Sequence, residues 1–190
     1  MKKKIDFVMI SKVIKIVSFL IIAVCFLCMS LSAITMVSGE TTKTYGPAYS
    51  FIFEGTIKTN NISYKANGMS FSILVAFIML VLSIVTISVS FINRGKEKYI
   101  PQWLVLISAM LALVASIVLL SSHRSLANVL ADTLIDGHSE AVTTTIYNNS
   151  KIEFGIWGPA VFGFISTFLS LVSLLFDGTF DKVRTKIGII

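Results

Sequence analysis

The sequence predicts an all-α membrane protein, a left-handed bundle of four transmembrane helices with a small extracellular β-sheet cap. Three observations support this fold class. Of the 190 residues, 55% are hydrophobic and 14% are charged, which leaves too few polar side chains to cover a water-soluble protein of this size. Four apolar segments are each long enough to cross a hydrocarbon core of roughly 30 Å. The two longer connections are rich in β-branched and turn-forming residues.

The four apolar segments predict a single membrane domain that comprises residues 1–190. We expect the transmembrane helices at residues 16–37, 69–92, 101–122 and 154–176. Pro101 suits the first turn of a helix, and Trp103 and Trp157 lie near expected helix ends, where aromatic rings favour the headgroup level. The other residues form extracellular loops at 39–68 and 123–151 and cytoplasmic parts at 1–15, 93–100 and 177–190.

Basic residues predict the orientation in the membrane. Eleven flank the helices on the side that holds both termini, and five lie in the two long loops. The eleven are Lys2, Lys3, Lys4, Lys12, Lys15, Arg94, Lys96, Lys98, Lys182, Arg184 and Lys186, and the five are Lys43, Lys58, Lys65, Arg124 and Lys151. Because the basic side of a membrane protein is cytoplasmic, we expect a multi-pass plasma-membrane protein with both termini in the cytoplasm. The net charge of +6 then reflects orientation and contact with membrane lipids, and it indicates no nucleic-acid partner.

The first segment has a second interpretation as a secretory signal, because it follows a Lys-rich start. Its apolar run is about 22 residues, longer than the roughly 7 to 15 of a signal core. The residues before Glu40 could nevertheless serve as a cleavage site, so removal of this segment stays open as an alternative.

Small and weakly polar side chains recur at coiled-coil spacing along the predicted helices. They include Cys25 and Cys28 on the first helix, Ser83 on the second, and Ser166 and Ser170 on the fourth. A C-x-x-C pair suggests redox or metal chemistry, but that chemistry needs a thiolate, which a bilayer interior disfavours. Small residues allow close helix approach in lipid, so we interpret these positions as helix-packing seams. The alternative is that the serine-lined faces border a permeation path.

The two long loops predict the cap. Residues 45–53 alternate, which would place Tyr49, Phe51 and Phe53 on one face of a strand as candidate partner contacts. Gly55 then breaks the run, and residues 56–65 predict a hairpin that turns at Asn60 and Asn61 and sets Ile57 opposite Tyr64. In the second loop, the third helix is expected to continue for about three turns until Gly137, and the stretch "AVTTTIYNNSK" is expected to add a strand.

The second loop also holds a cluster of possible metal ligands. Asp132, Asp136, His138 and Glu140 could supply oxygen and nitrogen atoms to a divalent ion, but their spacing is better explained as a solvated helix end. We therefore predict no catalytic, cofactor-binding or metal residues, and no cofactor. Asn61 and Asn148 match the glycosylation pattern, which leaves their modification open.

The layout resembles the claudin-like four-transmembrane family in its terminal orientation, its β-rich first loop and its extended third helix. The family's first loop carries Trp and Cys residues, whereas the nearest counterpart here is Tyr45-Gly46. The resemblance therefore implies a topology and assigns no site residue. The Lys, Ile, Asn and Ser content is otherwise similar to that of small four-helix membrane proteins of low-GC Gram-positive bacteria.

No nucleophile–base pair or Gly-rich phosphate loop is recognisable, so the sequence does not predict an enzyme. We expect a structural or interaction protein that acts through its extracellular cap, either as a homo-oligomer or as an accessory subunit of a larger membrane-protein complex. The alternative is an oligomeric channel or transporter subunit that uses the serine-lined faces.

Overall fold

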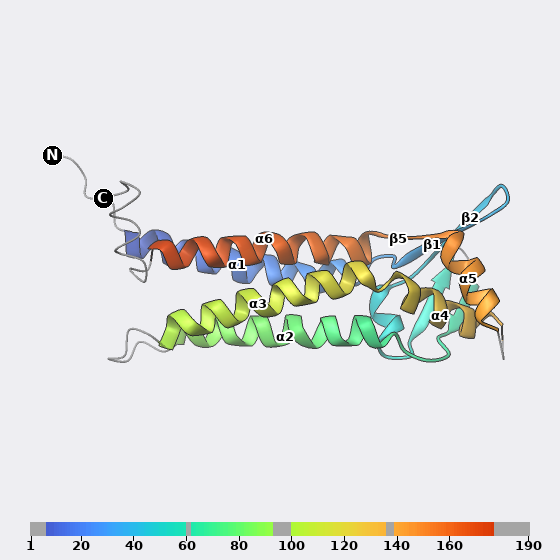
Figure 1. The fold of residues 1–190 in the computed structure, drawn as a ribbon, viewed down its shortest axis with the longest axis horizontal. Helices are drawn as coiled ribbons and strands as arrows, with labels where there is room; N and C mark the ends of the chain where they lie inside the picture. The colour runs from blue at the N-terminus through green and yellow to red at the C-terminus, as the bar shows by residue number, and fades with distance from the viewer. Residues whose placement is uncertain (1–6, 60–61, 93–99, 136–138, 177–190) are drawn as a thin grey trace.

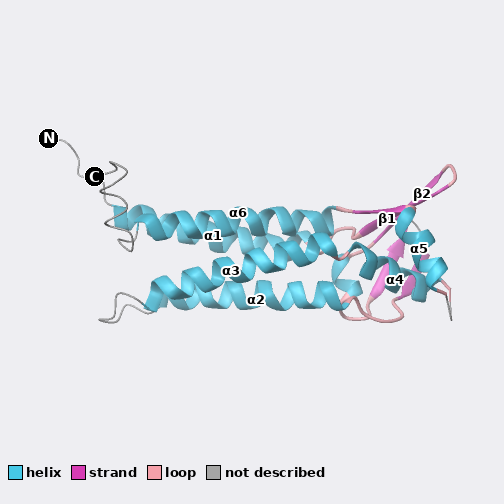
Figure 2. Ribbon diagram, viewed as in Figure 1, coloured by secondary structure: helices cyan, strands magenta, loops and turns pink. Residues whose placement is uncertain are grey.

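The computed structural model describes residues 7–59, 62–92, 100–135 and 139–176 (Figure 1). Four long helices dominate it, α1 (Phe7–Cys28), α2 (Phe71–Ile92), α3 (Ile100–Ser121) and α6 (Phe154–Phe176). Each is long and apolar enough to cross a membrane, which confirms the expected number of apolar helices and indicates a membrane protein. The four helices lie side by side, and the short helices and strands gather at one end of them (Figure 2).

The long helices associate as two pairs. Helix α1 packs along α6, α2 packs along α3, and α3 also packs along α6, whereas contact between α1 and α2 is slight. Gly163 allows the approach of α6 to α3, because a methyl group at this position would collide with the Ser116 hydroxyl. Small residues at such crossings allow the backbones to come close, as helices in lipid require. The left-handed sense of the bundle stays a prediction.

The first helix is displaced from its predicted position. It covers Phe7–Cys28 and not residues 16–37, and the later part of that range forms strand β1 (Ile34–Ser38). An apolar run does not distinguish a helix from a buried strand, and here Ile34, Thr35 and Val37 are β-branched and pair with other strands. The helix begins earlier than predicted, at Phe7, so it is still long enough to cross a membrane. In this added part Lys12 is exposed and Lys15 is buried.

Residues 29–59, 62–70, 122–135 and 139–153 form a compact unit at one end of the bundle, which we call the head. The strands of the head are β1, β2 (Thr41–Tyr45), β3 (Thr56–Thr59), β4 (Ile62–Lys65) and β5 (Ser150–Ile152). Three strands pair antiparallel in the order β2-β1-β5, so that Ile34 lies opposite both Tyr45 and Ile152. Strands β3 and β4 pair separately with Ile57 opposite Tyr64, which confirms the predicted hairpin register.

The second connection folds differently from its prediction. The third helix ends at Ser121 and a separate helix, α4 (His123–Leu134), follows it. A strand was predicted for residues 141–151, but Glu140–Asn148 form helix α5. The end of that stretch does form a strand, β5, which joins the sheet beside β1. Thr143 and Ile146, three positions apart, are buried, and exposed Thr144 and Thr145 donate to backbone carbonyls four residues earlier. Tertiary packing of one helical face thus outweighs the β preference of the threonines.

One hydrophobic core extends from the helices into the head. It includes Ile22 and Leu80 in the bundle and Phe51, Ile57 and Leu130 in the head, all fully buried. A short hairpin is marginally stable alone, and this shared core gives β3 and β4 the support that they need. The head is therefore fixed to the helix ends.

Candidate functional site

The three aromatic residues predicted as partner contacts do not share a strand face. Residues Ala48–Phe51 form a 3-10 helix, so the alternating pattern does not produce a strand here. Phe51 is completely buried, whereas Tyr49 is 46% exposed and Phe53 is 61% exposed. Phe51 is thus a core residue and cannot contact a partner in this conformation. The alternating sequence does not distinguish a strand from a 3-10 turn, because a 3-10 turn also directs successive side chains to different faces.

Tyr49 and Phe53 lie over the ends of the long helices. The backbone N–H of Tyr49 donates to the Met29 carbonyl oxygen at 3.2 Å, which holds this turn against the end of α1. The Phe53 ring meets the Phe77 ring of α2 edge-on, with 5.6 Å between centroids. Aromatic rings at the ends of membrane-spanning helices are typical of the membrane–water boundary.

All five predicted seam residues are buried between the long helices. The Ser18 hydroxyl of α1 lies 2.7 Å from the hydroxyls of both Ser166 and Ser170 of α6. Ser83 of α2 lies 2.9 Å from the Ser108 hydroxyl of α3. These hydroxyls satisfy one another across helix contacts, which favours packing over a water-filled path.

The two cysteines are buried like the serines of the seam. Cys25 is fully buried, and its thiol donates to the Pro159 carbonyl oxygen of α6 at 3.5 Å. Cys28 is 6% exposed, and both cysteines are free thiols. The contact of Cys25 belongs to the interface between α1 and α6.

An apolar depression, which we call the distal groove, opens in the head. It has a volume of about 380 Å³ and is formed by β1, the end of α4 and one face of α5. Its lining residues are Met36, Leu134, Ile135, Ala141, Val142, Thr145 and Ile146. Helix α4 leads away from the bundle and ends at the groove, so the groove lies toward the far end of the head (Figure 1).

Helices α4 and α5 are held in place by polar contacts. His123 Nε2 lies 2.9 Å from the Ser150 hydroxyl of β5, and the His123 ring packs against Tyr147 with 4.5 Å between centroids. Burial lowers the pKa of the His123 imidazole, so this residue favours its neutral form. The Arg124 guanidinium pairs with the Glu140 carboxylate at 2.9 Å, which joins the starts of the two helices.

The acidic cluster predicted as an alternative ion site is only partly described. Asp132 lies in α4 and Glu140 pairs with Arg124, while Asp136 and His138 lie outside the described residues. Within the described residues, no three His, Cys, Asp or Glu side chains gather closely enough to hold a metal ion. Asn148 is exposed at the end of α5, and Asn61 lies outside the described residues.

Sequence reasoning did not identify the distal groove. Its residues come from three segments that are far apart in the chain, and the strand predicted for residues 141–151 hid the helical face of Ala141, Val142 and Ile146. The available signal was Leu134-Ile135, an apolar pair that ends an amphipathic helix directly before a turn. Comparison of the chain with protein-family models, with curated proteins and with solved structures finds no match.

Proposed function

We propose that this protein is a membrane-embedded interaction protein that binds another protein through the distal groove. The observation that carries the proposal is the apolar lining of the groove, in which Thr145 is the one hydroxyl-bearing residue among seven. Ile135, which also lines the groove, is 48% exposed. Apolar surface of this kind, left open to water on a folded head, is typical of interaction sites.

The position of the groove separates it from the other exposed apolar surface. Many exposed apolar side chains, such as Leu20, Val85 and Phe168, lie along the four long helices, where lipid would cover them. Lipid would not cover the far end of the head, so apolar side chains there need a different partner. A protein that inserts one or two apolar side chains suits a groove of about 380 Å³.

The partner is either a second copy of the chain or another subunit of a membrane complex. The proposed setting is the plasma membrane, with both termini in the cytoplasm and the head outside, because the basic residues favour that orientation. The claudin-like resemblance is compatible with this topology and stays a prediction. An oligomeric pore, the alternative from the serine-lined faces, has less support because those hydroxyls bond to one another.

A substitution inside the groove tests the proposal. Ala141→Asp places a charge on an exposed groove residue in the first turn of α5, where the helix dipole tolerates an acid. Thr144→Asp is the matched control, because Thr144 is exposed on the same helix and does not line the groove. After extraction in mild detergent, the mass of the intact complex should fall for Ala141→Asp alone. A wild-type protein that is monomeric and free of partners, or a complex unaffected by Ala141→Asp, would contradict the proposal.

A further inference from the structure

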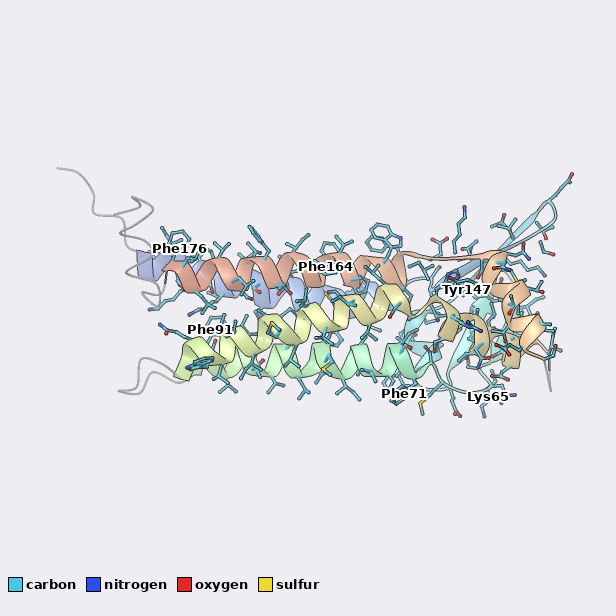
Figure 3. The ribbon with its side chains drawn as sticks, viewed as in Figure 1. Lys65, Phe71, Phe91, Tyr147, Phe164 and Phe176 are labelled. Carbon is cyan, nitrogen blue, oxygen red and sulfur yellow. The ribbon has the colours of Figure 1, made fainter. Side chains whose placement is uncertain are left out.

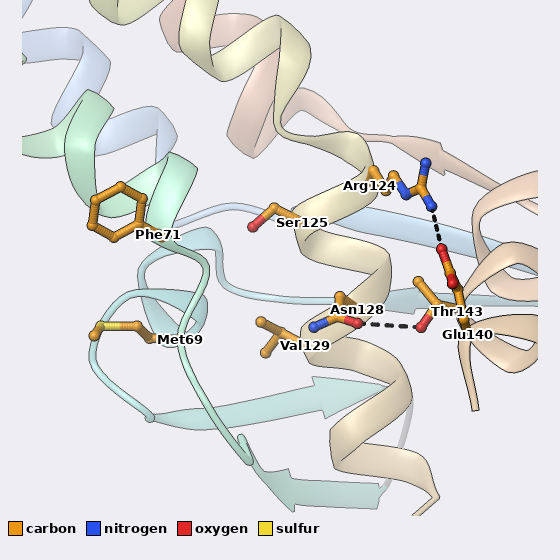
Figure 4. A pocket seen from close by; sticks show the side chains of 8 residues that line it. All are labelled: Met69, Phe71, Arg124, Ser125, Asn128, Val129, Glu140 and Thr143. Carbon is orange, nitrogen blue, oxygen red and sulfur yellow. Dashed lines mark hydrogen bonds and ion pairs between the residues drawn. The ribbon is translucent and has the colours of Figure 1, made fainter. Parts of the chain in front are cut away.

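A second cavity lies between the head and the start of α2, and we call it the boundary pocket. Its volume is about 570 Å³. One wall consists of Met69 and Phe71, and the other carries Arg124, Asn128 and Glu140 from helices α4 and α5 (Figure 4). The pocket thus has an apolar side and a charged side.

The boundary pocket lies at the level where the apolar spans end. Phe71 is the first residue of the second span, and Arg124 follows the last residue of the third span by three positions. The Ser70 hydroxyl lies 2.8 Å from the Ser125 hydroxyl, so α4 is held beside the start of α2 at this level. Phe71 is 70% exposed and projects from the start of α2 (Figure 3). Phospholipid headgroups occupy this depth of a bilayer.

The charges of the pocket form a matched pair. Among the described residues that line the pocket, Arg124 and Glu140 are the charged ones, and both are largely exposed. An exposed ion pair contributes little to stability, so a ligand can separate the two side chains at small cost. The Asn128 carbonyl accepts a hydrogen bond from Thr143, and its amide nitrogen points into the pocket as a further donor (Figure 4).

We propose that the boundary pocket binds the headgroup of a zwitterionic phospholipid that carries a phosphate and a primary ammonium. The guanidinium of Arg124 and the Asn128 amide donate to the phosphate oxygens, since a guanidinium matches phosphate geometry. The Glu140 carboxylate accepts from the ammonium. Met69 and Phe71 pack against the first part of the acyl chains, which continue into the bilayer. An anionic lipid without an ammonium would leave Glu140 unpaired beside its headgroup, so the pocket selects against it.

The experiment measures which lipid remains on the purified full-length protein. The protein is reconstituted in vesicles of equal parts phosphatidylethanolamine and phosphatidylglycerol, extracted in mild detergent and weighed intact, so that bound lipid is counted. We expect wild type to retain phosphatidylethanolamine in preference, and Arg124→Gln to bind it about tenfold more weakly. Glu140→Gln should shift the preference toward phosphatidylglycerol. Lys43→Gln, which removes an exposed cation of β2 outside the pocket, should behave as wild type.

Further arms separate lipid binding from a structural role and from binding of a free phosphate ester. The exchange of Arg124→Glu and Glu140→Arg together keeps an ion pair but reverses its charges, so we expect thermal stability close to that of wild type without recovery of lipid retention. Recovery of lipid retention by the exchange would overturn the proposal, as would equal retention of the two lipids by wild type or unchanged retention by Arg124→Gln. Competition by soluble glycerophosphoethanolamine at the same concentration as the lipid would overturn the assignment to a membrane lipid.

Discussion

The close approach of Gly155 to the backbone of Leu31 and Ser32 gives the sharpest prediction, the effect of Gly155→Ala. Gly155, the second residue of α6, lies beside the segment that connects α1 to β1, and its N–H donates to the Ser32 carbonyl oxygen at 2.8 Å. An added Cβ would collide with the carbonyl oxygens of Leu31 and Ser32. Both atoms belong to the backbone, so neither can turn away as a side chain would. The two segments must separate to accept the methyl group.

The expected cost follows from three contributions. Overpacking of a tight site costs about 1–3 kcal/mol. Weakening of the Gly155 hydrogen bond adds about 1 kcal/mol to the destabilisation, and the higher helix propensity of alanine offsets about 1 kcal/mol of it at most. The free energy of unfolding should therefore fall by about 2 kcal/mol. Equilibrium unfolding in mixed micelles, monitored by helix content, measures this change.

Two other glycines of α6 serve as internal controls. In Gly163→Ala the methyl group meets the Ser116 hydroxyl, which can rotate, and the Ala112 carbonyl oxygen at 3.3 Å. In Gly158→Ala its three nearest neighbours are atoms of the Phe154 ring, one turn earlier in the same helix, at 3.0–3.2 Å. The loss of stability should decrease in the order Gly155, Gly163, Gly158. A Gly155→Ala protein that is as stable as Gly158→Ala would refute the reasoning.

Three further predictions concern the core, the seam and pH. Phe51→Ala should lower the free energy of unfolding by about 3–5 kcal/mol and Tyr49→Ala by about 0.5 kcal/mol or less, measured as above; equal losses would contradict their opposite burial. A double-mutant cycle of Ser18→Ala and Ser166→Ala should give a coupling of about 0.6 kcal/mol, and additive losses would show that the hydroxyls do not interact. Burial lowers the pKa of His123, so the unfolded chain binds the proton more readily and thermal stability should fall as pH drops below about 6.5. His123→Gln should flatten that pH dependence, and an unchanged slope would assign it to another group.

The parts of the fold that the sequence predicts are those with one dominant local signal. Apolar length alone places α2, α3 and α6, because a largely apolar segment of about 20 residues in a chain of this composition indicates a membrane-spanning helix. The β3–β4 hairpin is predictable because a two-residue turn between alternating segments sets its register, with Ile57 opposite Tyr64.

The parts that the sequence does not predict depend on tertiary partners. Whether Ile34–Ser38 continues a helix or forms a strand is decided by β2 and β5, which pair with it on both sides. Phe51 has the same local pattern as Tyr49, and only the packing of the 3-10 turn shows which one enters the core. The distal groove needs three separate segments to meet, so no single stretch of sequence indicates it.

The attachment of the head to the helices restricts how the distal groove can meet a partner. A single residue, Glu153, separates β5 from α6, and the Glu153 N–H donates to the Ala33 carbonyl oxygen at 2.8 Å. The Ser70–Ser125 contact holds the start of α2 in the same way. With such short connections, the helices determine the height of the groove above the membrane.

Two copies in one membrane would therefore present their grooves at the same height. A two-fold axis along the membrane normal could then bring the two grooves together in an isologous contact. In such a dimer, cysteines introduced at Ala141 of both copies should cross-link with an oxidant, whereas cysteines at Thr144 should react less. If the partner is instead a different subunit, Ala141→Cys should form no dimer of the chain and should cross-link to that subunit. The position of the cross-link thus separates self-association from the role of an accessory subunit.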